Sequence, residues 1–119
     1  MGTVTDYIAT LEGPGRSLLE GYRSRAMRLV PSAEEGTSYG MAALRYRGRP
    51  LIAIITGKLG YTAYPFSPEV VEAVLATIDG FDSTKGGIRF TDDRPLPDAA
   101  FDGLVTGRRD EIDQALARR

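Results

Sequence analysis

The sequence predicts an α+β domain whose centre is a five-stranded, mainly antiparallel sheet. The expected elements follow one another in the order helix, helix, four strands, helix, strand, helix. The four consecutive strands are joined by short turns, so neighbouring strands must run antiparallel. Residues Leu51 to Ile55 are apolar at both parities. Such a strand is expected in the middle of the sheet, covered by helices on one face and by further chain or a second subunit on the other.

Two helices open the chain. Thr3 or Thr5 can cap a short first helix that ends at Gly13-Pro14. A second helix is expected from Arg16 to Val30, where apolar residues recur at helical spacing and Pro31 ends the run. Arginines occupy the remaining positions of this helix, and a solvated helix face explains them without a binding partner.

Four strands then follow, separated by turn signals. The first is expected from Glu35 to Gly40. The second, from Ala42 to Arg47, shows the period-two alternation of a strand with one buried face. After the central strand, Gly57-Lys58-Leu59-Gly60 predicts a hairpin turn into a fourth strand, Tyr61 to Pro65.

The C-terminal part supplies a helix, a strand and a last helix. Ser67-Pro68-Glu69 is a strong helix start, because Ser caps free amides, Pro suits the first turn and Glu opposes the positive end of the helix dipole. Ile88 to Phe90 predicts the fifth strand, and the last helix follows Pro97. Gly103 and Gly107 weaken that helix by about 1 kcal/mol each, unless close packing requires them.

The composition restricts the function more than it defines it. Residues 1–119 fit a single domain, and 15 basic against 16 acidic residues leave a net charge of -1, which argues against nucleic acid as a partner. The chain has no Cys and no His, so thiolate chemistry, imidazole bases and the commonest transition-metal ligands are absent. No signal peptide and no membrane-spanning run is evident. We therefore expect a cytoplasmic protein with no membrane partner.

Several short motifs occur in a characteristic order along nearly the entire chain. They are Tyr7-Ile8, Ser38-Tyr39-Gly40-Met41, Gly48-Arg49-Pro50-Leu51, Lys58, Tyr64-Pro65, Thr84-Lys85-Gly86, Ile88-Arg89-Phe90 and Arg94-Pro95-Leu96-Pro97. Together they resemble the YdhG-like family of small bacterial domains. The resemblance implies a two-layer α/β fold of the secretion-chaperone-like type. It also implies an iron-chaperone role, frataxin-like, which has been described for some members.

The sequence departs from the family pattern at two positions. Ala42 stands where many relatives have proline, and Gly60 stands where relatives often carry histidine. The second departure removes any metal role that depends on imidazole. Iron would then need oxygen ligands alone. The candidate carboxylates form three pairs, which are Glu34 with Glu35, Asp92 with Asp93, and Asp98 with Asp102. Each is equally explained as a turn, strand-entry or helix-start residue.

A small-ligand site is the second candidate. Five polar or aromatic residues of the family motifs could be gathered by the sheet into one concavity that suits a small anionic or carbonyl-bearing ligand: Tyr39, Lys58, Tyr64, Lys85 and Arg89. The alternative is that the tyrosines border the core and Lys58 is a hairpin-tip charge. The loop Ser83-Thr84-Lys85-Gly86-Gly87 could hold an anion but lacks the Walker order, and a structural loop is the simpler interpretation.

The sequence contains no nucleophile-base pair, so we predict a binding protein and not an enzyme. The leading hypothesis is a cytoplasmic binding domain of the YdhG-like family, with iron delivery as its candidate role and no other cofactor. The alternative is a protein-interaction or assembly module, such as a homodimer formed through the sheet, or a binder of small anions.

Overall fold

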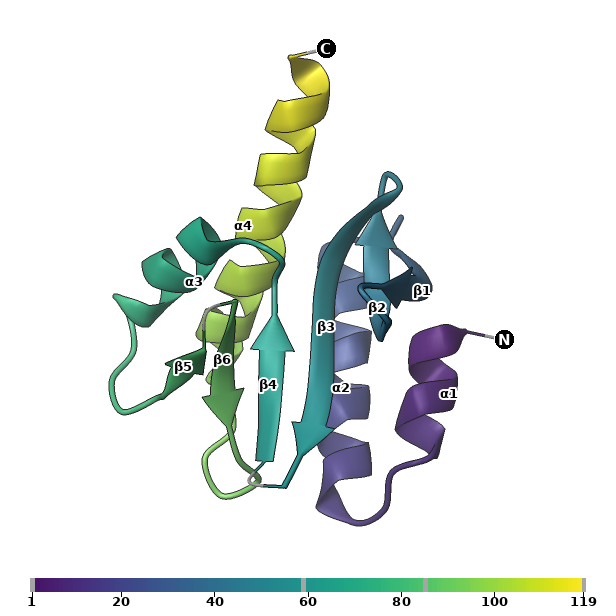
Figure 1. Cartoon of the computed structure of the whole chain (residues 1–119), viewed down its shortest axis with the longest axis vertical. Helices are drawn as coiled ribbons and strands as arrows, with labels where there is room; N and C mark the ends of the chain where they lie inside the picture. Colours follow the sequence, from purple (N-terminus) through teal and green to yellow (C-terminus); the bar gives the residue numbers. More distant parts are fainter. Residues whose placement is uncertain (1, 59, 85, 119) are drawn as a thin grey trace.

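The computed structural model describes residues 2–58, 60–84 and 86–118, and over these ranges the chain is α+β as predicted. It forms four helices there, which are α1 (Thr3–Ala9), α2 (Pro14–Leu29), α3 (Pro68–Leu75) and α4 (Asp98–Ala117). The strands are β1 (Glu34–Ser38), β2 (Met41–Tyr46), β3 (Arg49–Gly57), β4 (Gly60–Tyr64), β5 (Ser83–Thr84) and β6 (Gly87–Phe90). They make one open sheet in the order β1-β2-β3-β4-β6-β5 (Figure 1).

The sheet has six strands, so the prediction of five was wrong by one. The extra strand is β5, in which Ser83 pairs with Ile88 and Thr84 with Gly87. Two polar residues carry no alternation that a sequence pattern could reveal. The segment expected to be a loop before the last strand is therefore partly a strand.

A β-bulge explains why two adjacent residues of β3, Leu51 and Ile52, are both apolar and buried. The register between β2 and β3 changes from Leu44↔Ile52 to Arg45↔Pro50, which leaves Leu51 without an opposite residue. A bulge of this kind bends the strand and re-aims its side chains. Leu51 and Ile52 are adjacent, yet both are buried in the same core, at 0% and 4% exposure. β3 is central as predicted, and the bulge accounts for the apolar character of Leu51 and Ile52, the first two residues of the run.

The helices shelter one face of the sheet. Figure 1 shows α2 and α4 behind β3, β4 and β6, with α3 beside α4 and α1 beside the β1–β2 end. On β4 and β6, Tyr61, Ala63, Ile88 and Phe90 are buried, and the intervening residues Thr62 and Arg89 are less covered. This alternation places Thr62 and Arg89 on the face away from the helices.

Two helix starts show how the sequence fixes the elements. Ser67 caps α3 as predicted, because its hydroxyl accepts a hydrogen bond from Val70 N at 3.2 Å. Pro14 was expected to end the first helix, but it lies in the first turn of α2. Proline lacks the N–H that the first helical turn leaves unpaired, so it is well tolerated there.

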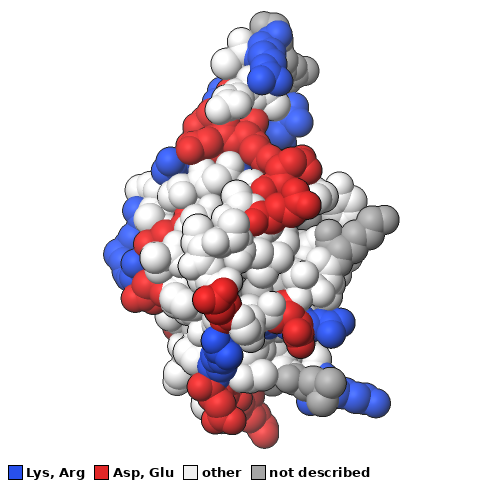
Figure 2. Space-filling model, turned by 90° about the vertical axis from the view of Figure 1, so that its left-hand side faces the viewer, with Lys and Arg blue, Asp and Glu red and all other residues white. Residues whose placement is uncertain are grey.

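The last helix projects beyond the sheet (Figure 1). Figure 2 shows the face that carries α3 and α4, with acidic side chains gathered near the base of the projection and basic side chains mostly at the periphery. Among residues 2–58, 60–84 and 86–118, no helix combines the length and the apolar character that a membrane crossing requires.

Candidate functional site

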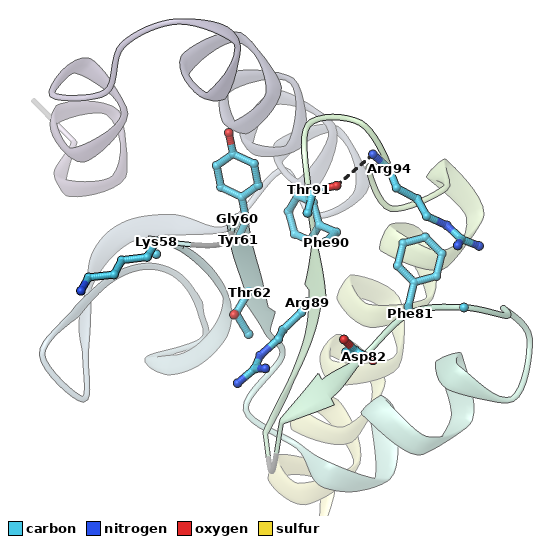
Figure 3. Close-up of a pocket in the computed structure, with 12 residues that line it drawn as sticks. Lys58, Gly60, Tyr61, Thr62, Phe81, Asp82, Arg89, Phe90, Thr91 and Arg94 are labelled. Carbon is cyan, nitrogen blue, oxygen red and sulfur yellow. Dashed lines mark hydrogen bonds between the residues drawn. The ribbon is translucent and has the colours of Figure 1, made fainter.

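An open depression of about 470 Å³ lies at the end of the sheet where the β3–β4 turn meets the connections into β5 and α4. It is lined by Gly57, Lys58, Gly60, Tyr61, Thr62, Gly80, Phe81, Asp82, Arg89, Phe90, Thr91 and Arg94 (Figure 3). Three of these side chains are cationic and one is acidic. An excess of positive charge in a concavity attracts anions.

Arg89 occupies the middle of this region because of its place in the sheet. It pairs with Thr62 of β4, so the guanidinium and the hydroxyl leave the same face side by side. Its neighbours Ile88 and Phe90 are buried against the helices, and this fixes the outward direction of Arg89. Among the described residues, no carboxylate oxygen lies within 4.0 Å of its nitrogens.

Asp82 faces Arg89 from the other side. Arg89 N donates a hydrogen bond to Asp82 O at 2.8 Å, which extends the β5–β6 ladder by one residue beyond Ser83↔Ile88. Both side chains are exposed. Thr62, Arg89 and Asp82 thus form one row across β4, β6 and the approach to β5.

Arg94 builds the wall of the depression. Its guanidinium lies 4.7 Å from the centre of the Phe81 ring and donates from Nη2 to Asp79 O at 2.7 Å. Its backbone N donates to Thr91 Oγ1 at 3.1 Å, the bond drawn in Figure 3. Gly80 has φ +78°, and a Cβ there would come within 2.6 Å of Arg94 Nη1. Arg94 therefore ties the connection before β5 to the connection before α4.

The five predicted ligand-binding residues do not all line this depression. Lys58 and Arg89 do, although Figure 3 shows Lys58 extending outward on its turn, away from Arg89. Tyr39 lies in the β1–β2 turn, is 84% exposed and stacks on Phe66 with ring centres 5.8 Å apart. Tyr64 lies on β4, with its ring close to Gly87. Lys85 is outside the described residues.

In each of the three predicted carboxylate pairs, one member accepts hydrogen bonds from a different element of the fold. Glu35 accepts hydrogen bonds from Thr5 N and Oγ1 at 2.6 and 2.7 Å. Asp92 accepts from the Tyr61 hydroxyl at 2.6 Å. Asp102 accepts from Arg25 at 2.6 and 2.8 Å, and Arg25 holds the pKa of Asp102 below its usual value, chiefly through this hydrogen bond. Over the ranges that the structure describes, no group of three or more acidic side chains is arranged to hold a metal ion.

The lining residues that the sequence analysis did not assign to the site include Thr62, Phe81, Asp82 and Arg94. A signal existed for Arg94, which opens one of the family motifs but was not assigned to the site. No sequence signal marks Asp82, because it becomes the partner of Arg89 only through the two-residue strand that follows it.

The fold and the depression define a small α+β domain with an open antiparallel sheet and helices on one face. No protein-family model matches the chain, and no curated protein matches it. A solved crystal structure does, that of YdhG, a DUF1801 family protein from Bacillus subtilis, with a TM-score of 0.79. The two chains share 17% sequence identity, and the match covers 95% of this chain and 91% of that one. The predicted YdhG-like fold is therefore confirmed, and at this identity the likeness concerns the fold alone.

Proposed function

We propose that this protein is a non-enzymatic binding domain that holds a small anionic ligand in the depression between β4, β6 and the approach to β5. Arg89 is the residue that contacts the anion. The supporting observation is its exposed guanidinium, which lies in a concavity with an excess of positive charge and has no carboxylate partner among the described residues.

The size and the walls of the depression agree with this role. Its volume of about 470 Å³ lies within the range of roughly 300–1,000 Å³ that is usual for small-molecule sites. Rings and glycine backbone form much of the wall, and Arg94 fixes one side of it. A guanidinium presents several N–H donors in one plane, which suits a carboxylate or phosphate group.

The site is better suited to an anion than to iron. The carboxylates that iron would need are spread over separate elements, and Glu35, Asp92 and Asp102 are each engaged by another side chain. We therefore place the small anion ahead of the iron-delivery role that the family resemblance implies.

A titration followed by two-dimensional amide NMR tests the proposal. The probes are inorganic phosphate, citrate, an amino-acid mixture and a nucleotide mixture, each at up to millimolar concentration. We expect at least one probe to shift the amide signals of the lining residues. Arg89→Gln should weaken this binding by about tenfold or more, because a charge-assisted hydrogen bond is lost.

Arg49→Gln is the matched control, since Arg49 is also an exposed strand arginine but lies at the opposite end of β3 from Gly57. The affinity of Arg49→Gln for the probe should stay within about twofold of that of the parent protein. This change is well below the one expected from the loss of a hydrogen bond. The proposal fails if no probe shifts the lining residues, or if the two variants bind equally well.

A further inference from the structure

The ligand can be specified further from two residues of unlike charge that are neighbours at one wall of the depression, Asp82 and Arg89. We infer, resting on the proposed function, that the ligand is a small zwitterion of the α-amino-acid class. Its carboxylate lies at Arg89 and its ammonium at Asp82.

The first step is the register of the strands. Ser83 is opposite Ile88, and the hydrogen bond from Arg89 N to Asp82 O makes Asp82 and Arg89 the next opposite pair. Side chains at directly opposite positions emerge on the same face, with Cβ atoms about 4.5–5.5 Å apart. The backbone therefore places the Cβ atoms of Asp82 and Arg89 next to each other at one wall of the depression, and in Figure 3 the Arg89 side chain extends toward Thr62.

The second step is that this pair stays open. Other unlike charges of the protein do form ion pairs, such as Arg25 with Asp102 at 2.6 Å and Arg47 with Asp113 at 3.0 Å. Among the described residues, Arg89 and Asp82 form no contact within 4.0 Å with each other or with any other charged group. Within residues 2–58, 60–84 and 86–118, neither charge is neutralised by an ion pair.

The third step is the chemistry that would satisfy both charges. An α-amino acid carries its carboxylate and its ammonium on the same carbon, so one small molecule can meet a guanidinium and a carboxylate that are neighbours. Thr62, opposite Arg89, places a hydroxyl where it can donate to the bound carboxylate. The Phe81 ring borders the same space and can contact an apolar side chain of the ligand.

The other two cations of the depression do not compete for this role. Arg94 is engaged with Phe81 and with the carbonyl oxygen of Asp79. Lys58 extends away from Arg89 in Figure 3. Arg89 and Asp82 thus remain as the pair of unlike charges that face the open space.

The test compares each amino acid with the acid that lacks its amino group. The probes are leucine with isocaproate, phenylalanine with phenylpropanoate, and glutamate with glutarate, together with inorganic phosphate. Binding is measured by calorimetry and by amide NMR on the parent protein, on Asp82→Asn and on Asp93→Asn. Asp93 is an exposed carboxylate outside the lining and serves as the matched charge control.

We expect at least one amino acid to bind about tenfold more tightly than its deaminated partner. Asp82→Asn should remove this preference for the amino acid, and the deaminated acid should then bind equally well or better. Asp93→Asn should preserve the preference.

If the deaminated acids bind as well as the amino acids, or if phosphate alone binds, the zwitterion proposal is wrong and the anion site stands. If Asp82→Asn strengthens the binding of an amino acid and of its deaminated partner by the same factor, Asp82 opposes binding of both, and the zwitterion proposal is again wrong. If none of these probes binds, the zwitterion proposal is wrong, and the citrate and nucleotide titrations then decide whether the anion site fails too.

Discussion

Two tyrosines couple the interior of the protein to its loops. Tyr22 donates its hydroxyl to Leu96 O at 3.0 Å, and Tyr61 donates to Asp92 at 2.6 Å. Burial raises the pKa of both hydroxyls to about 12, and the hydrogen bond to Asp92 adds to the effect at Tyr61. Each tyrosine joins the sheet or α2 to the segment between β6 and α4, which also borders the depression.

These tyrosines predict a loss of stability in alkali. The unfolded chain releases a tyrosine proton near pH 10, whereas the folded protein holds both protons until about pH 12. The stabilising contribution is complete below about pH 10 and disappears as the pH rises toward 12. Urea unfolding across this range should show the free energy of unfolding falling less steeply in Tyr22→Phe than in the parent protein.

At neutral pH, Tyr61→Phe should lower the free energy of unfolding by about 1 kcal/mol, the usual contribution of one hydrogen bond.

For the alkaline prediction, the contradicting outcome is a Tyr22→Phe variant whose free energy of unfolding falls with pH as steeply as that of the parent protein. The effect could then not be assigned to the buried Tyr22 hydroxyl.

At the level of elements, two glycines allow α3 and α4 to approach closely. A Cβ on Gly103 would lie 3.1 Å from Val74 Cγ2, and one on Gly107 would lie 3.3 Å from Val70 Cγ1. The penalty of glycine within a helix is offset by this packing, which brings the buried valines of α3 against α4. Because α3 leads into the connection that carries Phe81 and Asp82, the helix contact also helps to position the depression.

Gly103→Leu should therefore destabilise the protein by about 1–3 kcal/mol through overpacking. Gly21 provides the control, since it is a helix glycine with open space where its side chain would be. Gly21→Leu should be neutral or stabilising by up to about 1 kcal/mol. Chemical denaturation of both variants measures the difference, and equal effects would show that the α3–α4 contact is not close.

The elements that were predictable are those with a strong local pattern. α2, α3 and α4 carry apolar residues at helical spacing, and Ser67-Pro68 marks the start of α3 without ambiguity. The strand β5 and the bulge at Leu51 depend on which residues they face across the sheet. Sequence spacing does not contain that information, so the bulge that lets Leu51 and Ile52 share one core could not be predicted.

The candidate site was predictable to a similar extent. Lys58 and Arg89 were identified from the sequence and do line the depression. Asp82 and Thr62 could not be identified, because their relation to Arg89 is a matter of strand register. Tyr39 was predicted to share a site with Lys58 and Arg89, but it lies in the β1–β2 turn and stacks on Phe66.

At the scale of the whole molecule, one core joins all four helices and the sheet. Tyr22 lies between Phe90 and Phe101, with ring centres 5.5 and 4.7 Å away, and Phe90 also meets Tyr61 at 5.2 Å. The radius of gyration is 13.4 Å, close to the value of about 13.5 Å expected for a folded chain of this length. No part of the described chain has a separate core of its own.

A single core shared by the helices and the sheet predicts one cooperative unfolding transition. Far-UV circular dichroism and tyrosine fluorescence should give the same midpoint in urea, since Tyr22 and Tyr61 lie in the shared core. The midpoint should also be independent of protein concentration if the protein acts alone as a ligand-binding domain. A midpoint that rises with concentration would instead favour the homodimer that the apolar strand suggested.

The two borders of the sheet have a consequence for how the protein behaves in crowded solution. Among the described residues, the β5 border has two strand residues, and at the other border the Glu35 side chain of β1 accepts hydrogen bonds from Thr5 of α1. At the β5 border, a foreign strand that extended the sheet would find few described backbone groups to bond. The fold is in this respect built to resist the strand-by-strand growth from which fibrils begin.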